Sequence, residues 1–306
     1  MTTTHLVMDL ETIPAPEVPF EDKPKSNGFV VQKGAGSDLT MMEIELHDAN
    51  PFAPPPCHQI AVIGYAVFED YLPITMKCVG QEEDSEQRLL ELFLPYLEQL
   101  KPCLVTWNGR GFDVPVLTAR AMKYGMTMPW WYSSRNTRYR YSDRGHIDVL
   151  DWMTDFGAGR KCQLEHVARM IGLPGKPKGL GGPEGTVDGG KVDAMIRAGR
   201  LKDVRAYCMS DVLQESIVWL RYELLRGVID LAQYKKSIEA LREHFVFSPW
   251  RLPEGFYGDI NWAAARLDVT GGVHCGRDPS ETSEIRACGG TDATCSCECN
   301  TCLDPR

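Results

Sequence analysis

The chain has 306 residues, of which 43% are hydrophobic and 25% charged, an ordinary composition that supplies a core and excludes a wholly disordered protein. Its net charge of −9 excludes a histone-like or polybasic coat protein, so contact with nucleic acid would need a local basic surface or bound metal ions. The N-terminus lacks the pattern of a signal peptide, and no apolar run approaches the ~18 residues of a membrane span. We therefore expect a cytoplasmic protein with no membrane partner.

The first predicted strand covers residues 5–12, where apolar side chains alternate with others. Residues 6, 8 and 10 share one face of this strand, and residues 7, 9 and 11 share the other. Residues 13–57 contain eight prolines and a glycine-rich patch, which predicts a long, partly irregular insertion. Loops of this kind are often functional covers.

The next predicted elements are a hairpin and a helix. Residues 58–68 and 74–79 read as its two antiparallel strands. Residues 84–100 follow as a helix capped by Asp84 or Ser85, in which Pro95 predicts a kink or an early end. Residues 103–107 form a short apolar run that indicates a buried strand.

The second half of the chain is mostly helical in its patterns. Asp113 stands at the N-cap position of a helix over residues 116–124, after a turn at 108–111. Further helices are expected at 146–153, 163–172, 201–226 and 231–247, with a loop at 174–192. This order of elements predicts an α/β architecture with a mixed sheet flanked by helices.

Asp9 and Glu11 share one face of the first strand, about 6–7 Å apart along it. Neighbouring carboxylates repel, and a strand tolerates them when a divalent cation lies between them or when they face water. Tyr207 and Asp211 share one face of a long predicted helix because they are four residues apart. Each pair alone is a weak signal, and Asp113 alone would be an ordinary helix cap.

Taken together, the three motifs occur in an informative order. A strand with D-x-E comes first, N-G-x-x-F-D follows at a strand–helix junction (residues 108–113), and Y-x-x-x-D ends the set on a helix. The chain resembles the DEDD superfamily of 3′–5′ exonucleases, in the subclass whose last motif carries tyrosine. It is most similar to predicted bacterial exonucleases related to the proofreading domain of family B DNA polymerases. The resemblance runs from about residue 5 to about residue 235, and it implies an RNase H-like fold.

The resemblance also implies a catalytic site. Asp9, Glu11, Asp113 and Asp211 would hold two Mg²⁺ or Mn²⁺ ions, because both metals prefer oxygen ligands. Tyr207 would orient the attacking water, and nucleoside monophosphates would leave from the 3′ end of single-stranded DNA or RNA. No polymerase domain is visible, so a proofreading role would need a polymerase or repair partner.

Residues 129–146 interleave aromatic and arginine side chains with a single acid, Asp143. Aromatic rings stack on bases and cations contact phosphates, which is typical of a single-strand binder. Alternatively, the tryptophans pack into the core and the arginines pair with surface acids. The residues expected to bind substrate are Asn108, Phe112, Trp130, Trp131, Arg138, Tyr139, Arg140 and Lys176.

Two other motifs carry less weight. Residues 185–191 fit half of a phosphate-binding loop, but Val192 replaces the Ser or Thr that would bind Mg²⁺, so we expect no nucleotide triphosphate site. Six of the 11 cysteines lie in residues 275–306, and Cys299 and Cys302 have the spacing of zinc ligands. The other spacings there match no standard finger, so a disordered extension is favoured over a zinc or redox site.

The sequence thus predicts three segments: an exonuclease domain over residues 1–235, a helical extension over 236–262 and a cysteine-rich tail over 263–306. Two rival functions remain open. One is a non-catalytic nucleic-acid-binding module that retains the exonuclease fold. The other is a metal-dependent phosphoesterase that acts on small nucleotides.

Overall fold

The computed structural model describes residues 3–20, 26–33, 39–46, 53–176, 191–246 and 260–268. Met1–Val269 form one compact unit, and the expected domain boundary at residue 235 falls inside its helix α9 (Leu231–Val246). The phosphate-loop-like motif up to residue 190 and the cysteines of the expected tail lie outside the described residues. In the described part of the chain, every helix is too short or too polar to cross a membrane.

A five-stranded mixed sheet forms the centre of this unit, with the strand order β5-β4-β1-β6-β7. The strands are β1 (Thr4–Pro14), β4 (His58–Glu69), β5 (Leu72–Cys78), β6 (Cys103–Thr106) and β7 (His146–Asp148). β1, β4 and β5 pair antiparallel, whereas β6 and β7 run parallel to β1. These strands confirm the expected RNase H-like α/β fold, in which helices flank a mixed sheet. The expected hairpin over residues 58–79 is confirmed as well.

The alternation along β1 divides the core into two layers. Leu6, Met8 and Leu10 belong to one buried cluster, and Val7 belongs to the other. Because successive side chains of a strand point to opposite faces, Asp9 and Glu11 lie on the Val7 face. The acids of the first motif therefore face the helices that cover Val7.

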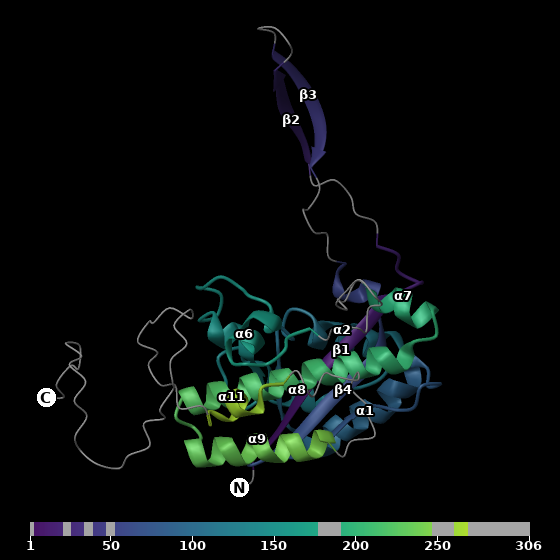
Figure 1. The fold of residues 1–306 in the computed structure, drawn as a ribbon. Coiled ribbons are helices and arrows are strands. Elements are labelled where there is room, and N and C mark those ends of the chain that lie inside the picture. Colours follow the sequence, from purple (N-terminus) through teal and green to yellow (C-terminus); the bar gives the residue numbers. More distant parts are fainter. Residues whose placement is uncertain are drawn as a thin grey trace, which may run out of the picture. The chain divides into compact units, whose positions relative to one another are not determined.

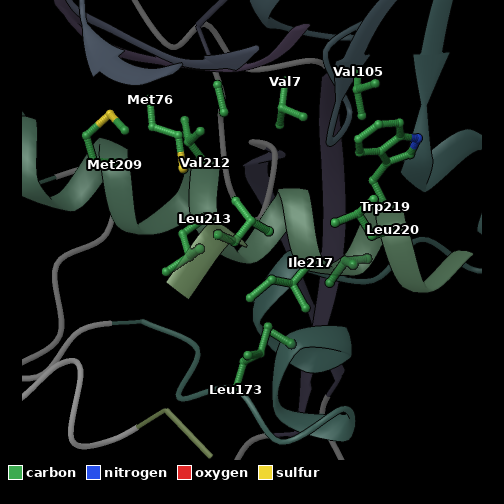
Figure 2. Close-up of a cluster of buried hydrophobic side chains, with 14 of the residues drawn as sticks. Val7, Met76, Val105, Leu173, Met209, Val212, Leu213, Ile217, Trp219 and Leu220 are labelled. Carbon is green, nitrogen blue, oxygen red and sulfur yellow. The ribbon is translucent and has the colours of Figure 1, made fainter. Parts of the chain in front are cut away.

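Two long helices cover the Val7 face, α8 (Leu201–Leu225) and α9, drawn in green beside the strands in Figure 1. Figure 2 shows Met209 and Val212 of α8 beside Met76 of β5, with Trp219 further along the helix toward Val105. Most of α8 is buried, and its interior positions carry apolar side chains on nearly every side. This packing fixes the rotation of α8, and with it the direction of its polar side chains.

The opposite face of the sheet packs against α1 (Glu86–Leu100) and α2 (Asp113–Lys123). Ser85 caps α1, as predicted, by accepting the backbone N–H of Arg88. The early end predicted at Pro95 was wrong, because α1 continues to Leu100. Pro95 lies on the exposed side of the helix, where water can bond the carbonyl that lacks its usual donor.

Two sequence predictions are corrected by the fold. Residues 146–153 are not one helix, because His146–Asp148 form β7 and only Val149–Met153 form a helix, α5. The insertion over residues 13–57 is more regular than expected, because it contains an antiparallel hairpin of β2 (Ser26–Lys33) and β3 (Leu39–Leu46). A short 3-10 turn, η1 (Pro55–Cys57), then leads into β4.

The remaining helices are short: α3 (Pro129–Ser133), α4 (Arg135–Arg138), α6 (Leu164–Met170), α7 (Val192–Arg197) and α11 (Trp262–Arg266). The helices predicted at 163–172, 201–226 and 231–247 are confirmed, each within a few residues.

Candidate active site

The turn after β6 brings the second acidic motif to β1. β1 pairs with β6 only as far as Val7, so the backbone N–H of Leu10 needs another acceptor. Asp113 supplies it, since its Oδ1 accepts the Leu10 N–H at 3.1 Å. Asp113 is the first residue of α2 and not its N-cap, a position that Phe112 takes, so the predicted capping role was wrong.

Asp148, at the end of β7, holds the same turn in place. Its Oδ1 accepts the backbone N–H of Asn108 at 2.9 Å, and its Oδ2 accepts that of Arg110 at 3.0 Å. Asn108 has a left-handed backbone with φ of 63°, a conformation that these bonds help to hold. Gly109 lies so close to Thr106 that a Cβ would stand 2.3 Å from its Oγ1, so only glycine fits there.

The third motif reaches the site from α8. Tyr207 and Asp211 lie one turn apart on α8, and both line the same pocket. Tyr207 is buried and has a strongly raised pKa, first because of burial and then because of the neighbouring acids. It therefore remains a protonated phenol, which can donate a hydrogen bond.

All five residues predicted to be catalytic line one pocket with a volume of ≈ 520 Å³. They come from three elements that are far apart in sequence: β1, the start of α2 and the middle of α8. Other side chains that line this pocket are Trp107, Asn108, Phe112, Lys161, Gln163, Glu165, Lys176 and Gln214. The meeting of the three motifs in one pocket is the main structural feature of the site.

The four carboxyl groups of the three acidic motifs resist ionisation. Burial raises the pKa of Asp113 and of Asp211 to about 7 each. The pKa values of Asp9 and Glu11 are raised well above their ordinary range, first by burial and then by the neighbouring acids. Such mutual repulsion is relieved when a cation lies between the groups.

The donor atoms fit a divalent cation. Asp9 Oδ2 is buried and has no hydrogen-bond partner among the described residues. Its lone pairs therefore accept no hydrogen bond there, although buried polar atoms usually have a partner. One carboxylate oxygen each from Asp9 and Glu11 lies within 4.8 Å of the other and of the Cys208 sulfur. Carboxylate oxygens are the ligands that Mg²⁺ and Mn²⁺ prefer.

Three of the residues expected to bind substrate also line the pocket: Asn108, Phe112 and Lys176. The structure adds Lys161, whose Nζ donates to Asn108 Oδ1 at 3.2 Å, and Gln214, whose Oε1 accepts the Gly175 N–H at 2.8 Å. Sequence reasoning missed both. Lys161 stands in an irregular segment with no motif, and Gln214 is one of many polar residues on α8.

The aromatic and arginine segment does not contribute to this pocket. Trp130 and Trp131 are buried in the core cluster with α1 and α2, and neither lines this pocket. Arg140 forms a two-bond ion pair with Asp151, both contacts at 2.7 Å. Arg138 lies over the ring of Tyr132, while Tyr139 is partly exposed, away from the pocket. These contacts favour the alternative of core tryptophans and paired arginines for Trp130, Trp131 and Arg140.

Comparison with known proteins shows which family the chain belongs to. Residues 50–249 match the family described as predicted 3′–5′ exonuclease related to the exonuclease domain of PolB. The chain belongs to this family. A DNA polymerase of Pyrococcus glycovorans is 29% identical over 122 residues, which is 35% of this chain and 15% of the polymerase. The chain thus spans only a small part of that curated relative.

Two solved structures are also similar. The family B DNA polymerase of the archaeon Pyrobaculum calidifontis aligns with 80% of this chain and 29% of its own, at 15% identity and a TM-score of 0.46. E. coli exonuclease I in complex with an oligonucleotide aligns with 75% of this chain and 46% of its own, at 15% identity and a TM-score of 0.30.

Proposed function

We propose that this protein is a metal-dependent 3′–5′ exonuclease that hydrolyses the phosphodiester bonds of single-stranded DNA or RNA and releases nucleoside monophosphates. The observation that carries the proposal is the meeting of Asp9, Glu11, Asp113, Tyr207 and Asp211 in one pocket. Membership of the exonuclease family supports it. We place the chain in the tyrosine subclass because Tyr207 precedes Asp211 by one helical turn.

The four carboxylates would hold two Mg²⁺ or Mn²⁺ ions. When bound, such ions stabilise the charge on the attacking and leaving oxygens of an in-line displacement. Asp9 and Glu11 lie on the face of β1 that α8 covers, and Asp211 of α8 lines the same pocket. Asp113 completes the set from α2, held by its bond to Leu10.

The other side chains of the pocket would position the substrate. The Tyr207 hydroxyl keeps its proton and can orient a water molecule toward the scissile phosphate. Lys161 and Lys176 bring positive charge to a wall otherwise rich in acids, which suits phosphate oxygens. Phe112 and Trp107 supply aromatic surface for the terminal bases.

The proposal is tested with the purified full chain, Mg²⁺ or Mn²⁺, and oligonucleotides that carry a label at the 3′ end. We expect labelled mononucleotide to appear first from single-stranded DNA or RNA, with less from duplex DNA, and no release by Asp211→Ala. The matched control is Asp193→Ala, which removes a half-buried acid paired with the exposed Arg197 outside the pocket. No release by the wild type would refute the proposal.

The same assay separates the two rival functions. A non-catalytic binding module would retain the oligonucleotide without metal and leave it intact. A phosphoesterase for small nucleotides would cleave short nucleotides and would not require a free 3′ end on a polymer. Proofreading or repair would in addition require a polymerase or repair partner, which a pull-down from cells would identify. The expected cytoplasmic location is tested by cell fractionation.

A further inference from the structure

A thiol lies against the carboxylates of the proposed metal site. Cys208 follows Tyr207 on α8, is fully buried and forms no disulfide. Its Sγ donates a hydrogen bond to the backbone carbonyl oxygen of Asp9 at 3.5 Å. The ligand atoms of Cys208, Asp9 and Glu11 all lie within 4.8 Å of one another. The two carboxylates of the first motif therefore have a sulfur atom as their close neighbour.

The sheet leaves space for this sulfur atom. Gly64 of β4 is the register partner of Asp9, and a Cβ added to it would lie 2.7 Å from Cys208 Sγ. Such an approach is shorter than real Cβ contacts, so any larger residue at position 64 would push the thiol aside. The thiol thus occupies a place that depends on the absence of a side chain at position 64.

A separate observation points to a ligand at this place. Asp9 Oδ2 is buried and lacks a hydrogen-bond partner in the described part of the chain. An unpartnered buried carboxylate oxygen costs free energy, and a cation would remove that cost. Three ligands at about 2.0–2.3 Å from one ion, with a fourth position open, are the donor set of zinc sites.

We propose that Cys208 turns the Asp9–Glu11 pair into a site for a soft divalent cation, Zn²⁺ or Cd²⁺, that inhibits the nuclease by displacing the ion needed for hydrolysis. Thiolate sulfur binds Zn²⁺ and Cd²⁺ strongly and contributes little to Mg²⁺ binding. On binding, the sulfur–metal bond replaces the S–H bond, and the proton leaves to the solvent. The inhibition rests on the proposed exonuclease function, whereas the binding does not.

Without a soft cation the thiol does not compete for the site. Its S–H donates to the backbone carbonyl oxygen of Asp9, and a thiol that keeps its proton is a poor metal ligand. Oxygen-preferring ions then meet only carboxylates. The geometry therefore permits Mg²⁺-supported hydrolysis and a sulfur-dependent inhibition at one place.

Binding is measured by adding CdCl₂ to metal-free full-length protein and following the ultraviolet charge-transfer absorption of cadmium thiolates. The wild type and Cys208→Ser share all other cysteines, so the difference in absorption between these two proteins reports one thiolate. Cys78→Ser is the matched control, because Cys78 is also a buried thiol beside Gly64, as its register partner on β5, but is not part of the cluster. We expect Cys208→Ser to lose part of the absorption seen in the wild type. Cys78→Ser should not show the same loss, with the same stoichiometry and affinity of the missing site.

Inhibition is measured as the ZnCl₂ concentration that halves Mg²⁺-supported mononucleotide release. We expect Cys208→Ser to need about ten-fold more Zn²⁺ or higher, with Cys78→Ser unchanged. Equal cadmium absorption and equal zinc inhibition in the wild type and Cys208→Ser would overturn the proposal. Cys208→Ala serves if circular dichroism shows that Cys208→Ser is unfolded. If no variant releases nucleotides with any metal, the proposed exonuclease function fails, while the absorption difference still decides the binding.

Discussion

Asp113 Oδ1 accepts the backbone N–H of Leu10 at 3.1 Å, which ties the start of α2 to the strand that carries Asp9 and Glu11. This bond lies where β1 has no β6 partner. The Asp113 side chain therefore satisfies a strand N–H group that lacks a ladder partner, and it also lines the pocket of the proposed metal site. The fold and the chemistry are therefore linked at this residue, and substitutions there separate the two roles.

Asp113→Asn should abolish nucleotide release but stabilise the metal-free protein. The asparagine Oδ1 can still accept the Leu10 N–H, whereas the charge is lost. Burial raises the pKa of Asp113 to about 7, above its unfolded value, so the ionised group costs stability as pH rises from about 4 to 7. Each pKa unit corresponds to about 1.4 kcal/mol. A thermal melt at neutral pH without metal measures this, with Asp113→Ala expected to melt below Asp113→Asn because it also loses the bond.

Metal affinity should rise with pH through about 7. Asp113 and Asp211 both have a pKa raised to about 7 by burial, and protons compete with a cation for the same oxygens. Calorimetric titration with Mn²⁺ should show roughly ten-fold tighter binding, or more, at about pH 8 than at about pH 6. An affinity that does not change over this range would contradict the proposed ligand set.

Asp148→Asn should disturb the site without touching the substrate. The two carboxylate oxygens of Asp148 accept the backbone N–H groups of Asn108 and Arg110. In asparagine an NH₂ group replaces one of these oxygens, so a donor would face one of the two N–H groups. We expect a loss of about 1–3 kcal/mol in the free energy of unfolding. In protein that is still folded, kcat and Mn²⁺ affinity should fall while KM for the oligonucleotide changes little. A loss of stability with kcat and Mn²⁺ affinity unchanged would mean that Asp148 is only structural.

Lys161→Ala and Lys176→Ala should weaken substrate binding. Both side chains line the pocket, so each loss removes a contact to phosphate, raises KM and makes binding less dependent on salt. The matched control is Lys202→Ala on α8, where the lysine lies 3.9 Å from Glu82 and outside the pocket. Equal effects of all three substitutions would indicate general electrostatics and not a substrate contact.

Trp131→Ala should act on stability and not on binding. The side chain is 5% exposed and packs in the cluster under α1 and α2, so its loss leaves a cavity that costs about 3–5 kcal/mol. Chemical denaturation measures the cost. Oligonucleotide affinity of the folded fraction should equal that of the wild type, and a selective loss of affinity would restore the expectation that this ring stacks on a base.

The sequence predicted the elements with strong periodicity. The alternation in β1 placed Asp9 and Glu11 on the face opposite Leu6 and Met8, and the long pattern over residues 201–226 predicted α8. β7 was missed because it has only three residues and runs into α5 without a break. Over three residues, the alternation of apolar and polar side chains cannot distinguish a strand from the first turn of a helix.

The site was predicted in part for a similar reason. Three motifs with defined spacing indicated the five residues that meet in the pocket. Lys161, in contrast, reaches the pocket through tertiary packing alone, from a segment with no pattern. The clustering of aromatic residues and arginines at 129–146 pointed to binding, but the sequence does not reveal that Trp130 and Trp131 fill space beside α1. Local composition thus says little about which way a large side chain points.

The central claim is that the carboxylates of β1, α2 and α8 act together in metal-dependent hydrolysis. It is tested most directly by mononucleotide release from a 3′-labelled single strand, with Mg²⁺ or Mn²⁺, by the wild type and by Asp9→Asn. We expect release by the wild type that stops with EDTA, and none by Asp9→Asn despite an unchanged fold by circular dichroism. Equal release by both proteins would contradict the account.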